Sequence, residues 1–306
     1  MKILLTGTTG QLGHALLSSL QSAGTIIVPE RHEMDLSKPE QLRTIIRQIK
    51  PDLIINPAAY TSVDKAETEP ELAHAINAIA PGVMAEEAKN LNAALIHYST
   101  DYVFDGDKRN ADGGLQPYVE SDPAGPVNVY GKTKLAGEQA IHQSGCRHLI
   151  FRTSWVYSLF GKNFLLTMLR LANEREELSI VNDQWGAPSP TNWLAKATAH
   201  IITLSQKTEN SDQWWNQHQG VYHMTPKGKT SWCGFAEKIM LQASASGLLT
   251  KAAPVVKGIP ASEYPTPASR PVNSCMDTEK LVAHFGLLIP TWEEALVTCM
   301  QTQARS

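Results

Sequence analysis

The sequence has no excess of basic residues. Its 306 residues include 27 Lys and Arg against 30 Asp and Glu, which gives a formal net charge of −3. A protein that binds nucleic acid through phosphate contacts normally carries a basic excess or a clustered basic stripe. Because the sequence shows neither, we expect no nucleic-acid partner.

Paired cysteines and long apolar runs are also missing. The four cysteines lie far apart, with no Cys-x-x-Cys pair and no histidine at metal-ligand spacing, so neither a disulfide framework nor a structural zinc is expected. No run approaches the roughly 18 apolar residues of a membrane span. The N-terminal MKILLTGTTG is too short in apolar residues for a signal peptide. We therefore expect a reduced, soluble protein of the cytoplasm, with no membrane partner and no metal.

The first half of the sequence contains alternating short apolar runs and helical patterns. This alternation is typical of parallel strands joined by crossover helices, and the uniformly apolar strands indicate a sheet covered on both faces. The expected strands are Lys2–Thr6, Thr25–Pro29, Leu53–Asn56, Leu95–Ser99 and Leu149–Thr153, and the expected helices are Gln11–Ala23, Pro39–Lys50, Pro70–Asn90 and Val129–Ser144. The fold class is thus α/β, with a Rossmann-type doubly wound parallel sheet.

Beyond about Trp155 the alternation gives way to mixed helices and Pro-rich turns. This change indicates a second lobe, so we expect residues 1–155 to form a nucleotide-binding domain and 156–306 mainly a smaller α/β substrate lobe. Some segments of the second half are free to return to the first domain.

Two stretches rich in polar and turn-forming residues are expected to be surface loops. They are Asp105–Pro126 and Thr208–Gly220. The second contains Trp214 and Trp215, which we expect to pack onto their own lobe.

A glycine-rich segment follows the first expected strand. Gly7, Gly10 and Gly13 have the spacing Gly-x-x-Gly-x-x-Gly and lead into the first helix. Glycines there allow a tight turn, close backbone approach to a pyrophosphate and close helix packing, while the helix N-terminus favours negative charge. The segment predicts dinucleotide binding; the alternative is a glycine-rich turn without a ligand.

The end of the second expected strand carries charges of both signs. The Glu30 carboxylate could accept hydrogen bonds from an adenosine ribose 2′-hydroxyl, whereas Arg31 could hold a 2′-phosphate. NADH and NADPH therefore both stay open. Asp35, followed by Leu36, could flank the adenine or could cap the next helix together with Ser37.

A tyrosine and a lysine lie four residues apart in the segment YGKTK. Tyr130 and Lys134 share one face of a helix, and a nearby ammonium favours the phenolate form of a tyrosine, whose free pKa is about 10. Such a tyrosine is a better proton-transfer group near neutral pH. Taken alone, the spacing is better explained by an exposed helix pair.

A third segment strengthens the pattern. STDYVFDG at 99–106 delivers a hydroxyl to the carboxyl end of a strand, where open α/β sheets bind ligands. With the glycine motif and the Tyr-x-x-x-Lys pair, it resembles the extended short-chain dehydrogenase/reductase family. Further similar segments cover almost the whole chain: NPAAYTSVDKAE at 56–67, VYGKTKLAGE at 129–138, FRTSWVY at 151–157, NDQWGAPS at 182–189 and YPTPASRPVNS at 264–274.

Within that family, these segments are similar to the branch that reduces a dTDP-linked keto sugar. The resemblance implies that NADH or NADPH reduces the C4 ketone of dTDP-4-dehydro-6-deoxy-L-mannose to dTDP-L-rhamnose. It assigns Tyr130 as proton donor to the forming alkoxide, and Thr100 as a hydrogen-bond donor to the same oxygen. Lys134 would hold the nicotinamide ribose and tune Tyr130.

The resemblance also implies which residues line the ligands. The cofactor would contact Gly10, Gln11, Leu12, Glu30, Asp35, Leu36, Ala59, Tyr60 and Thr61. The sugar nucleotide would contact Thr100, Asp101 and Trp155. From its own chemistry, Arg270 is a further candidate for the diphosphate, because a guanidinium binds phosphate in a bidentate way; the alternative is an ordinary surface arginine.

Two departures from related branches narrow the prediction. The 4,6-dehydratases carry Asp-Glu after the Thr, but here Asp101 precedes Tyr102, which favours simple reduction. Some relatives pair through a metal held by helix carboxylates; the corresponding stretches His14–Leu16 and Asn192–Lys196 contain none, so we expect a monomer or weak homodimer without a metal bridge. The alternatives are a regulatory subunit of the methionine adenosyltransferase type and a reductase or epimerase of another nucleotide sugar.

Overall fold

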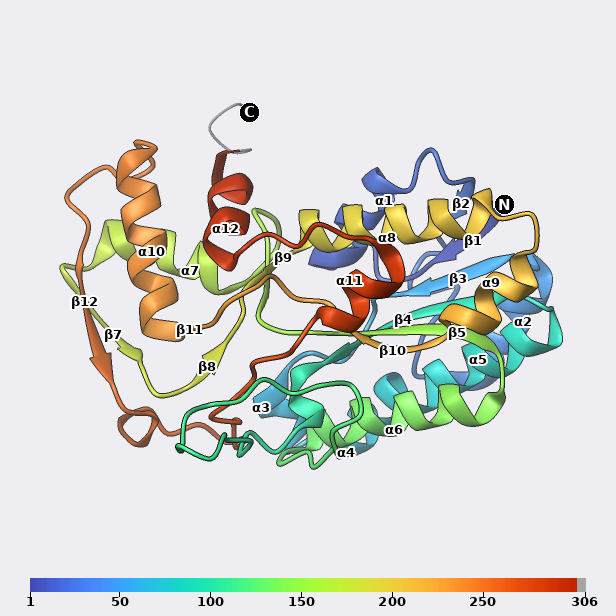
Figure 1. Ribbon diagram of the computed structural model, residues 1–306, viewed down its shortest axis with the longest axis horizontal. Coiled ribbons are helices and arrows are strands. Elements are labelled where there is room, and N and C mark those ends of the chain that lie inside the picture. Colours follow the sequence, from blue (N-terminus) through green and yellow to red (C-terminus); the bar gives the residue numbers. More distant parts are fainter. Residues whose placement is uncertain (302–306) are drawn as a thin grey trace.

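A computed structural model describes residues 1–301, and one parallel sheet forms its centre (Figure 1). The six strands follow the order β10-β5-β4-β3-β1-β2, and every neighbouring pair is parallel. The order reverses between β1 and β3, so ligands are expected beyond the carboxyl ends of these strands. The strands are β1 (Lys2–Leu5), β2 (Thr25–Ile27), β3 (Leu53–Asn56), β4 (Ala94–Thr100), β5 (Arg147–Thr153) and β10 (Gly220–His223).

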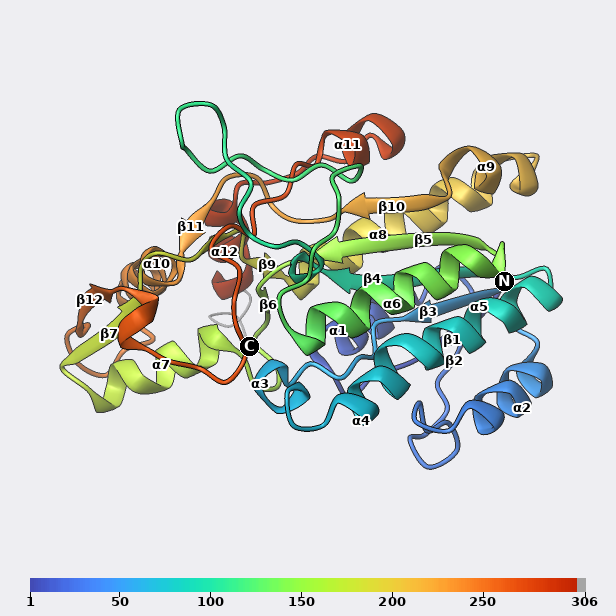
Figure 2. The same ribbon diagram turned by 90° about the horizontal axis from the view of Figure 1, so that it is seen from below.

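Helices cover both faces of this sheet (Figures 1 and 2). One face carries α1 (Gln11–Ser19), α8 (Thr191–Lys207), α9 (Ser211–His218) and α11 (Glu279–Phe285), and the other carries α2 (Pro39–Ile49), α5 (Ala80–Asn90) and α6 (Val129–Ser144). Alternate residues of β1 enter the two cores: Ile3 and Leu5 face one helix layer, and Leu4 faces the other. The inner strands β1, β3, β4 and β5 are therefore buried on both sides, as expected, whereas the edge strand β2 is partly exposed.

The expected helices are present with small changes at their ends. The helix expected at Gln11–Ala23 ends at Ser19, and Val129–Ser144 has the expected bounds. The helix expected at Pro70–Asn90 consists of α4 (Pro70–His74), a π-helical turn η1 (Ala75–Ile79) and α5, and a short α3 (Val63–Ala66) precedes it. Single π turns inside α-helices are frequent at functional sites.

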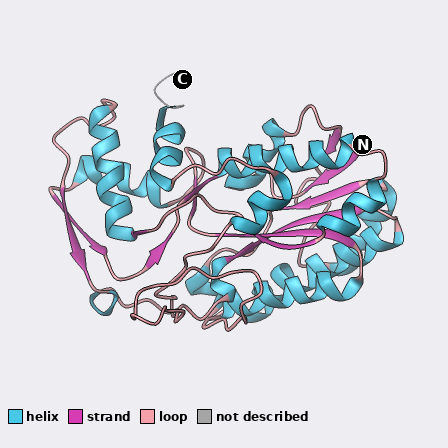
Figure 3. Cartoon of the chain, viewed as in Figure 1, coloured by secondary structure: helices cyan, strands magenta, loops and turns pink. Residues whose placement is uncertain are grey.

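The second lobe combines three helices with a small sheet. The helices α7 (Phe164–Glu174), α10 (Trp232–Ala245) and α12 (Trp292–Gln301) share a core with β7 (Glu177–Val181), which pairs in parallel with β12 (Val255–Ile259). Shorter elements connect this lobe to the sheet: β6 (Val156–Tyr157) pairs with β9 (Ser189–Pro190), and β8 (Trp185–Gly186) pairs with β11 (Thr230–Ser231). Figure 3 shows the lobe beside one end of the central sheet.

Several segments of the second half return to the first sheet. Strand β10 extends it beside β5, α8 packs against α1, and α11 packs against β10. Two 3-10 turns, η2 (Asp101–Val103) and η3 (Ala261–Glu263), complete the described elements. Within residues 1–301, no helix combines the length and apolar character needed to cross a membrane.

The segment Asp105–Pro126 is a loop without helix or strand, as expected. Tyr118 holds this loop in place. Its hydroxyl donates to Asp105 Oδ1 (2.6 Å), and its ring stacks on Phe104 with centroids 4.1 Å apart. The backbone of Tyr118 also pairs with Met276 of the distant C-terminal segment. The loop is thus anchored to the protein at its middle.

The prediction of a loop at Thr208–Gly220 is wrong. Residues 211–218 form α9, whose start is capped by the Asn210 side chain accepting from the Gln213 amide (3.0 Å). Trp214 and Trp215 are buried in the core on one face of the central sheet, so they pack against this sheet and not against the second lobe. The polar residues around the pair concealed an amphipathic helix with one apolar face.

We expect Trp215→Ala to lower the free energy of unfolding by about 3–5 kcal/mol, because it leaves a cavity between α9 and the sheet. Chemical denaturation measures this loss. The matched control is Gln217→Ala on the exposed face of the same helix, which should change stability by less than about 0.5 kcal/mol. Equal effects of the two substitutions would contradict the packing described above.

Candidate active site

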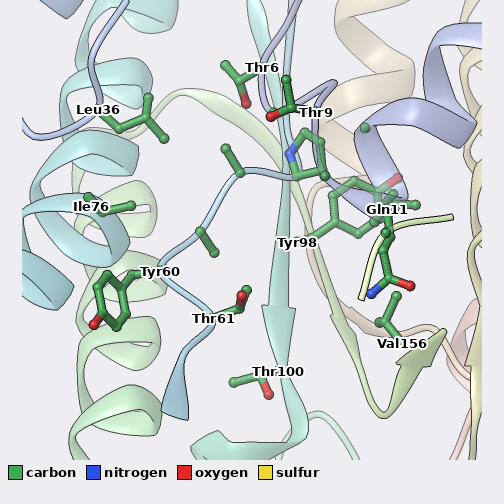
Figure 4. A pocket seen from close by; sticks show the side chains of 18 of the residues that line it. Thr6, Thr9, Gln11, Leu36, Tyr60, Thr61, Ile76, Tyr98, Thr100 and Val156 are labelled. Carbon is green, nitrogen blue, oxygen red and sulfur yellow. The ribbon is translucent and has the colours of Figure 1, made fainter. Parts of the chain in front are cut away.

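A cavity of about 1080 Å³ opens beyond the carboxyl ends of β1, β3, β4 and β5. Figure 4 shows Leu36, Ile76 and Tyr60 along one wall and Gln11 with Val156 along another. Almost all of the predicted site residues line it: Gly7, Gly10, Gln11, Leu12, Gly13, Glu30, Arg31, Asp35, Leu36, Ala59, Tyr60, Thr61, Thr100, Asp101, Tyr130, Lys134 and Trp155. The sheet therefore brings together residues that are up to about half the chain apart.

The glycine motif forms a tight turn at the start of α1. Gly7 has a φ of +62°, in the left-handed region, and its carbonyl accepts from the Gly10 amide at 2.9 Å. A Cβ on Gly13 would lie 2.1 Å from the Gly7 oxygen, so only glycine fits there. No side chain caps α1, which leaves its N-terminal amides for an anion. This geometry fits the pyrophosphate of a dinucleotide.

The far end of the cavity carries the predicted adenosine contacts. Glu30 is exposed and lies 3.1 Å from His32 Nδ1. Asp35 accepts hydrogen bonds from the amide (3.0 Å) and the hydroxyl (2.8 Å) of Ser37, which lower the pKa of its carboxyl. These bonds form a local turn before α2, but α2 has Lys38 as its N-cap and no side-chain cap, so Asp35 does not cap the helix. Its contact with adenine stays a prediction.

The loop after β3 is fixed by a residue that the sequence analysis missed. Asn77, fully buried in the π turn, accepts from the Tyr60 amide (2.8 Å) and donates to the Tyr60 carbonyl (3.1 Å). Its side chain also donates to Thr133 on α6 at 3.1 Å. Ala59, Tyr60 and Thr61 therefore line the cavity in a defined conformation. An isolated Asn in a helical pattern gave no signal of this role.

Two glycines let α6 closely approach the turn after β4 and the π turn η1. A Cβ on Gly131 would lie 2.1 Å from the Tyr102 oxygen, and one on Gly137 would lie 2.1 Å from the Asn77 oxygen. The start of the helix is capped by Asn128, whose side chain accepts from the Gly131 amide at 2.7 Å. This packing brings Tyr130 and Lys134 to the carboxyl end of β4.

Burial controls the protonation of Tyr130. It raises the pKa of the phenol to about 12, while a hydrogen bond with Thr100 acts in the opposite direction. The phenol is therefore protonated near neutral pH. This corrects the expectation that Lys134 favours the phenolate: burial has the largest effect on the pKa of Tyr130, and Lys134 Nζ donates to the Tyr98 carbonyl of β4.

Lys134 is one of the most buried side chains, at 1% exposure. Its Nζ donates to the Tyr98 carbonyl at 2.6 Å and lies 3.1 Å from His97 Nε2. Burial lowers the pKa of the amine to about 8, although the nearby Glu138 carboxylate raises it. The lysine thus changes charge within the working pH range of most enzymes.

Thr100 and Asp101 meet Tyr130 where β4 ends. The Thr100 hydroxyl donates to Asp101 Oδ1 at 2.9 Å. Asp101 is 3% exposed, and burial raises the pKa of its carboxyl to about 6, against hydrogen bonds from Ser274 and Thr100. A hydroxyl, a phenol and a carboxyl of shifted pKa thus converge at one point.

An aromatic pair, Trp155 and Trp232, forms part of the cavity lining. Trp155 has a φ of +47°, which is strained for a residue with a side chain, and its ring stacks on Trp232 with centroids 3.6 Å apart. Gly186 lies against the indole, because a Cβ there would be 2.7 Å from Trp155 Cε2. Trp232 was missed, since nothing in the sequence relates it to Trp155.

Arg270 lies apart from the predicted set. It is not among the residues that line the cavity; its guanidinium donates to Asp64 Oδ2 (2.9 Å) and to the Ala268 carbonyl (3.1 Å). Its contact with a diphosphate stays a prediction.

Comparisons with known proteins agree on one family. The chain matches the family described as the RmlD substrate binding domain over residues 1–305. It is 45% identical over 302 residues to a dTDP-4-dehydrorhamnose reductase of Burkholderia thailandensis, with 98% of each chain covered. Its structure is similar to that of a dTDP-4-dehydrorhamnose reductase of Bacillus anthracis in complex with NADP (TM-score 0.86, 34% identity, 98% and 99% of the two chains covered).

A more distant match extends the likeness in fold alone. A UDP-glucose 4-epimerase of Thermus thermophilus, in complex with NAD, has a TM-score of 0.77 at 17% identity and covers 100% of this chain and 99% of its own. Together with the observed sheet, these structures confirm the predicted α/β fold class.

We expect Asp101→Asn to stabilise the protein at pH 7 and above. Because the pKa of Asp101 is about 6 when folded and 3.8 ordinarily, the folded state holds the proton more tightly, and stability falls as the pH rises from about 4 through 6. The amide removes this dependence, a gain on the order of 2–3 kcal/mol that vanishes below pH 4. Urea unfolding of both proteins at pH 4 and pH 7.5 measures it.

Asp105→Asn is the matched control with the opposite sign. Hydrogen bonds from the Asp107 amide and the Tyr118 hydroxyl lower the pKa of Asp105, so its charge stabilises the protein at neutral pH and this contribution is lost on acidification. The variant should be less stable than the parent at pH 7.5 only. A pH-independent effect of Asp101→Asn would contradict the burial argument.

Proposed function

Because this chain belongs to the dTDP-4-dehydrorhamnose reductase family, we propose that its residues Thr100, Tyr130 and Lys134 carry out that reaction. The chain is an NAD(P)H-dependent oxidoreductase of dTDP-rhamnose biosynthesis, which reduces the C4 ketone of dTDP-4-dehydrorhamnose to dTDP-L-rhamnose. The convergence of a threonine hydroxyl, a protonated phenol and a buried lysine beside the glycine turn is the observation that carries the assignment of roles.

The cofactor-binding residues fit a dinucleotide. The uncapped start of α1 and the glycine turn receive the pyrophosphate, and Glu30 or Arg31 contacts the adenosine ribose. When bound, the nicotinamide cofactor supplies the hydride for C4. Lys134 faces the same cavity, and we assign it to the nicotinamide ribose.

Tyr130 supplies the proton that balances the reduction. As C4 accepts a hydride, its oxygen gains negative charge and takes the phenolic proton. The Thr100 hydroxyl turns from Asp101 Oδ1 to donate a hydrogen bond to the same oxygen. A pKa of about 12 keeps this proton on Tyr130 until the oxygen becomes basic. The phenolate left behind is a strong base and recovers a proton from water.

The substrate side is assigned to Thr100, Asp101 and Trp155. Asp101 is followed by Tyr102, so the site lacks the carboxylic acid pair that elimination of water requires. Reduction without dehydration follows from this set. For Arg270 to bind the diphosphate of the substrate, it must first break its ion pair with Asp64.

We also propose that the protein works in the cytoplasm as a monomer or weak homodimer without a bridging metal. Neither α1 nor α8 contains an Asp or Glu that could hold a metal between two copies. Light scattering with and without EDTA tests this assembly.

We expect Tyr130→Phe to lower kcat about 100-fold to 10,000-fold, because the proton donor is lost while the ring remains. NAD(P)H oxidation with the dTDP-linked keto sugar measures the rate, and NMR identifies the product. The dissociation constant for NADPH should stay within about twofold. The exposed Tyr264→Phe is the matched control and should leave kcat unchanged; a wild-type rate for Tyr130→Phe would remove the mechanism.

We expect Glu30 and Arg31, which follow β2, to contribute to the binding of different cofactors. We expect Arg31→Ala to raise the KM for NADPH about tenfold and to leave that for NADH unchanged, because only NADPH has a 2′-phosphate to pair with a guanidinium. Glu30→Ala should raise the KM for NADH, because the ribose 2′-hydroxyl of NADH donates to the Glu30 carboxylate. Initial rates with each cofactor measure both. If neither variant changes either KM, these residues do not contact the ribose.

A further inference from the structure

A line of four polar side chains runs through the core behind the cavity. The Thr6 hydroxyl donates to Asn56 Oδ1 (2.7 Å), Asn56 Nδ2 lies 3.1 Å from His97 Nδ1, and His97 Nε2 lies 3.1 Å from Lys134 Nζ. Asn56 and His97 are direct partners on β3 and β4. Thr6 is 6% exposed, Lys134 is 1% exposed, and the two residues between them are fully buried.

The hydrogen bonds of this line can run in either of two directions. A charged Lys134 has no lone pair, so it must donate to His97 Nε2, which places the ring hydrogen on Nδ1. The Asn56 amide must then present its oxygen to Nδ1 and its NH₂ to Thr6, the orientation opposite to that in the structure, since the two amide ends are assigned from their neighbours.

A neutral Lys134 permits the other arrangement. Its lone pair accepts from His97 Nε2–H, and Nδ1 then accepts from Asn56 Nδ2 as the structure has it. In both arrangements the lysine still donates to the Tyr98 carbonyl. Every hydrogen bond of the line is satisfied in each case, and the two differ in direction and by one proton at Lys134.

We propose that His97 is a positioning residue for Lys134, which holds the amine through Nε2 and changes its tautomer when the lysine changes its charge. The proposal deepens the function assigned to the same site and rests on it only where activity is measured. The sequence gives no sign of this role for His97, because a lone histidine in a strand is typically a structural core residue.

The surroundings support a tautomer change in place of protonation of the ring. Burial, followed by repulsion from Lys134, lowers the pKa of His97 well below its ordinary value, so the ring stays neutral. Glu138, also on α6, raises the pKa of Lys134 through its negative charge. Its carboxylate is itself paired with Arg152 of β5 at 2.7 Å. Tyr130 on α6 is a neutral phenol, and β1 and β3 contribute the neutral Thr6 and Asn56.

Two substitutions of His97 separate its two nitrogens. In His97→Gln the amide reaches the place of Nε2 and still offers an acceptor to Lys134; in His97→Asn it reaches only the place of Nδ1. We expect the Gln variant to keep kcat within about threefold. The Asn variant leaves the ammonium without this acceptor, so the alkaline limb of the kcat profile, near pH 8 in the parent, should move down by about one unit while KM for the keto sugar changes little.

A purely structural role for His97 predicts a different result. Both variants would then lose activity in proportion to stability, with the alkaline limb in place, and that outcome would overturn the proposal. Thermal unfolding of both variants supplies the stability scale.

The tautomer itself is measured without substrate. In protein labelled with ¹⁵N-histidine, we expect His97 to carry its hydrogen on Nδ1 at pH 6 and on Nε2 at pH 9.5. The control Lys134→Met should remove this pH dependence. A single tautomer throughout the range would overturn the coupling even if the reductase mechanism holds, whereas loss of activity in Tyr130→Phe tests that mechanism alone.

Discussion

The close approach of α6 to the end of β4 is the constraint on which the site depends. Gly131 meets the backbone oxygen of Tyr102 just beyond β4, and Gly137 meets that of Asn77 in the π turn η1. Any Cβ at either position would collide, so α6 lies closer to these two segments than ordinary side chains allow. That approach places the Lys134 ammonium inside the core, where an unpaired charge would be very costly. The Tyr98 carbonyl and His97 offset this cost, and they fix the lysine beside the cavity.

Burial also determines which groups carry protons when the reaction starts. It raises the pKa of Tyr130 to about 12 and that of Asp101 to about 6, and it lowers the pKa of Lys134 to about 8. Each shift favours the neutral form of the group. A reductase needs a proton donor at the ketone oxygen, and a protonated phenol in a buried site meets that need. The close packing of α6 therefore also keeps the Tyr130 phenol protonated, as the proposed reduction requires.

The sequence predicted the parts of the site whose residue types follow from backbone geometry or from family resemblance. The glycine turn and the Tyr130–Lys134 spacing place the cavity correctly, because parallel strands end at one edge. Asn77 and Trp232 could not be predicted, since their roles arise only from contacts between distant segments. Helix α9 was missed because polar residues surround its two tryptophans. The ion pair of Arg270 with Asp64 could not be predicted because 206 residues separate the two partners.

The second lobe takes part in the site through a strained residue. A non-glycine residue at φ +47° costs on the order of 1–3 kcal/mol, so Trp155 keeps this conformation only because the surrounding structure imposes it. The stack on Trp232 and the lack of a side chain at Gly186 provide that restraint, and both residues lie beyond the central sheet. Gln11 adds a polar link, accepting from Ser158 and Asn163 at 2.8 Å each. This wall of the cavity is thus positioned by contacts between the two lobes, and the segment around Trp155 lines the cavity in addition to connecting them.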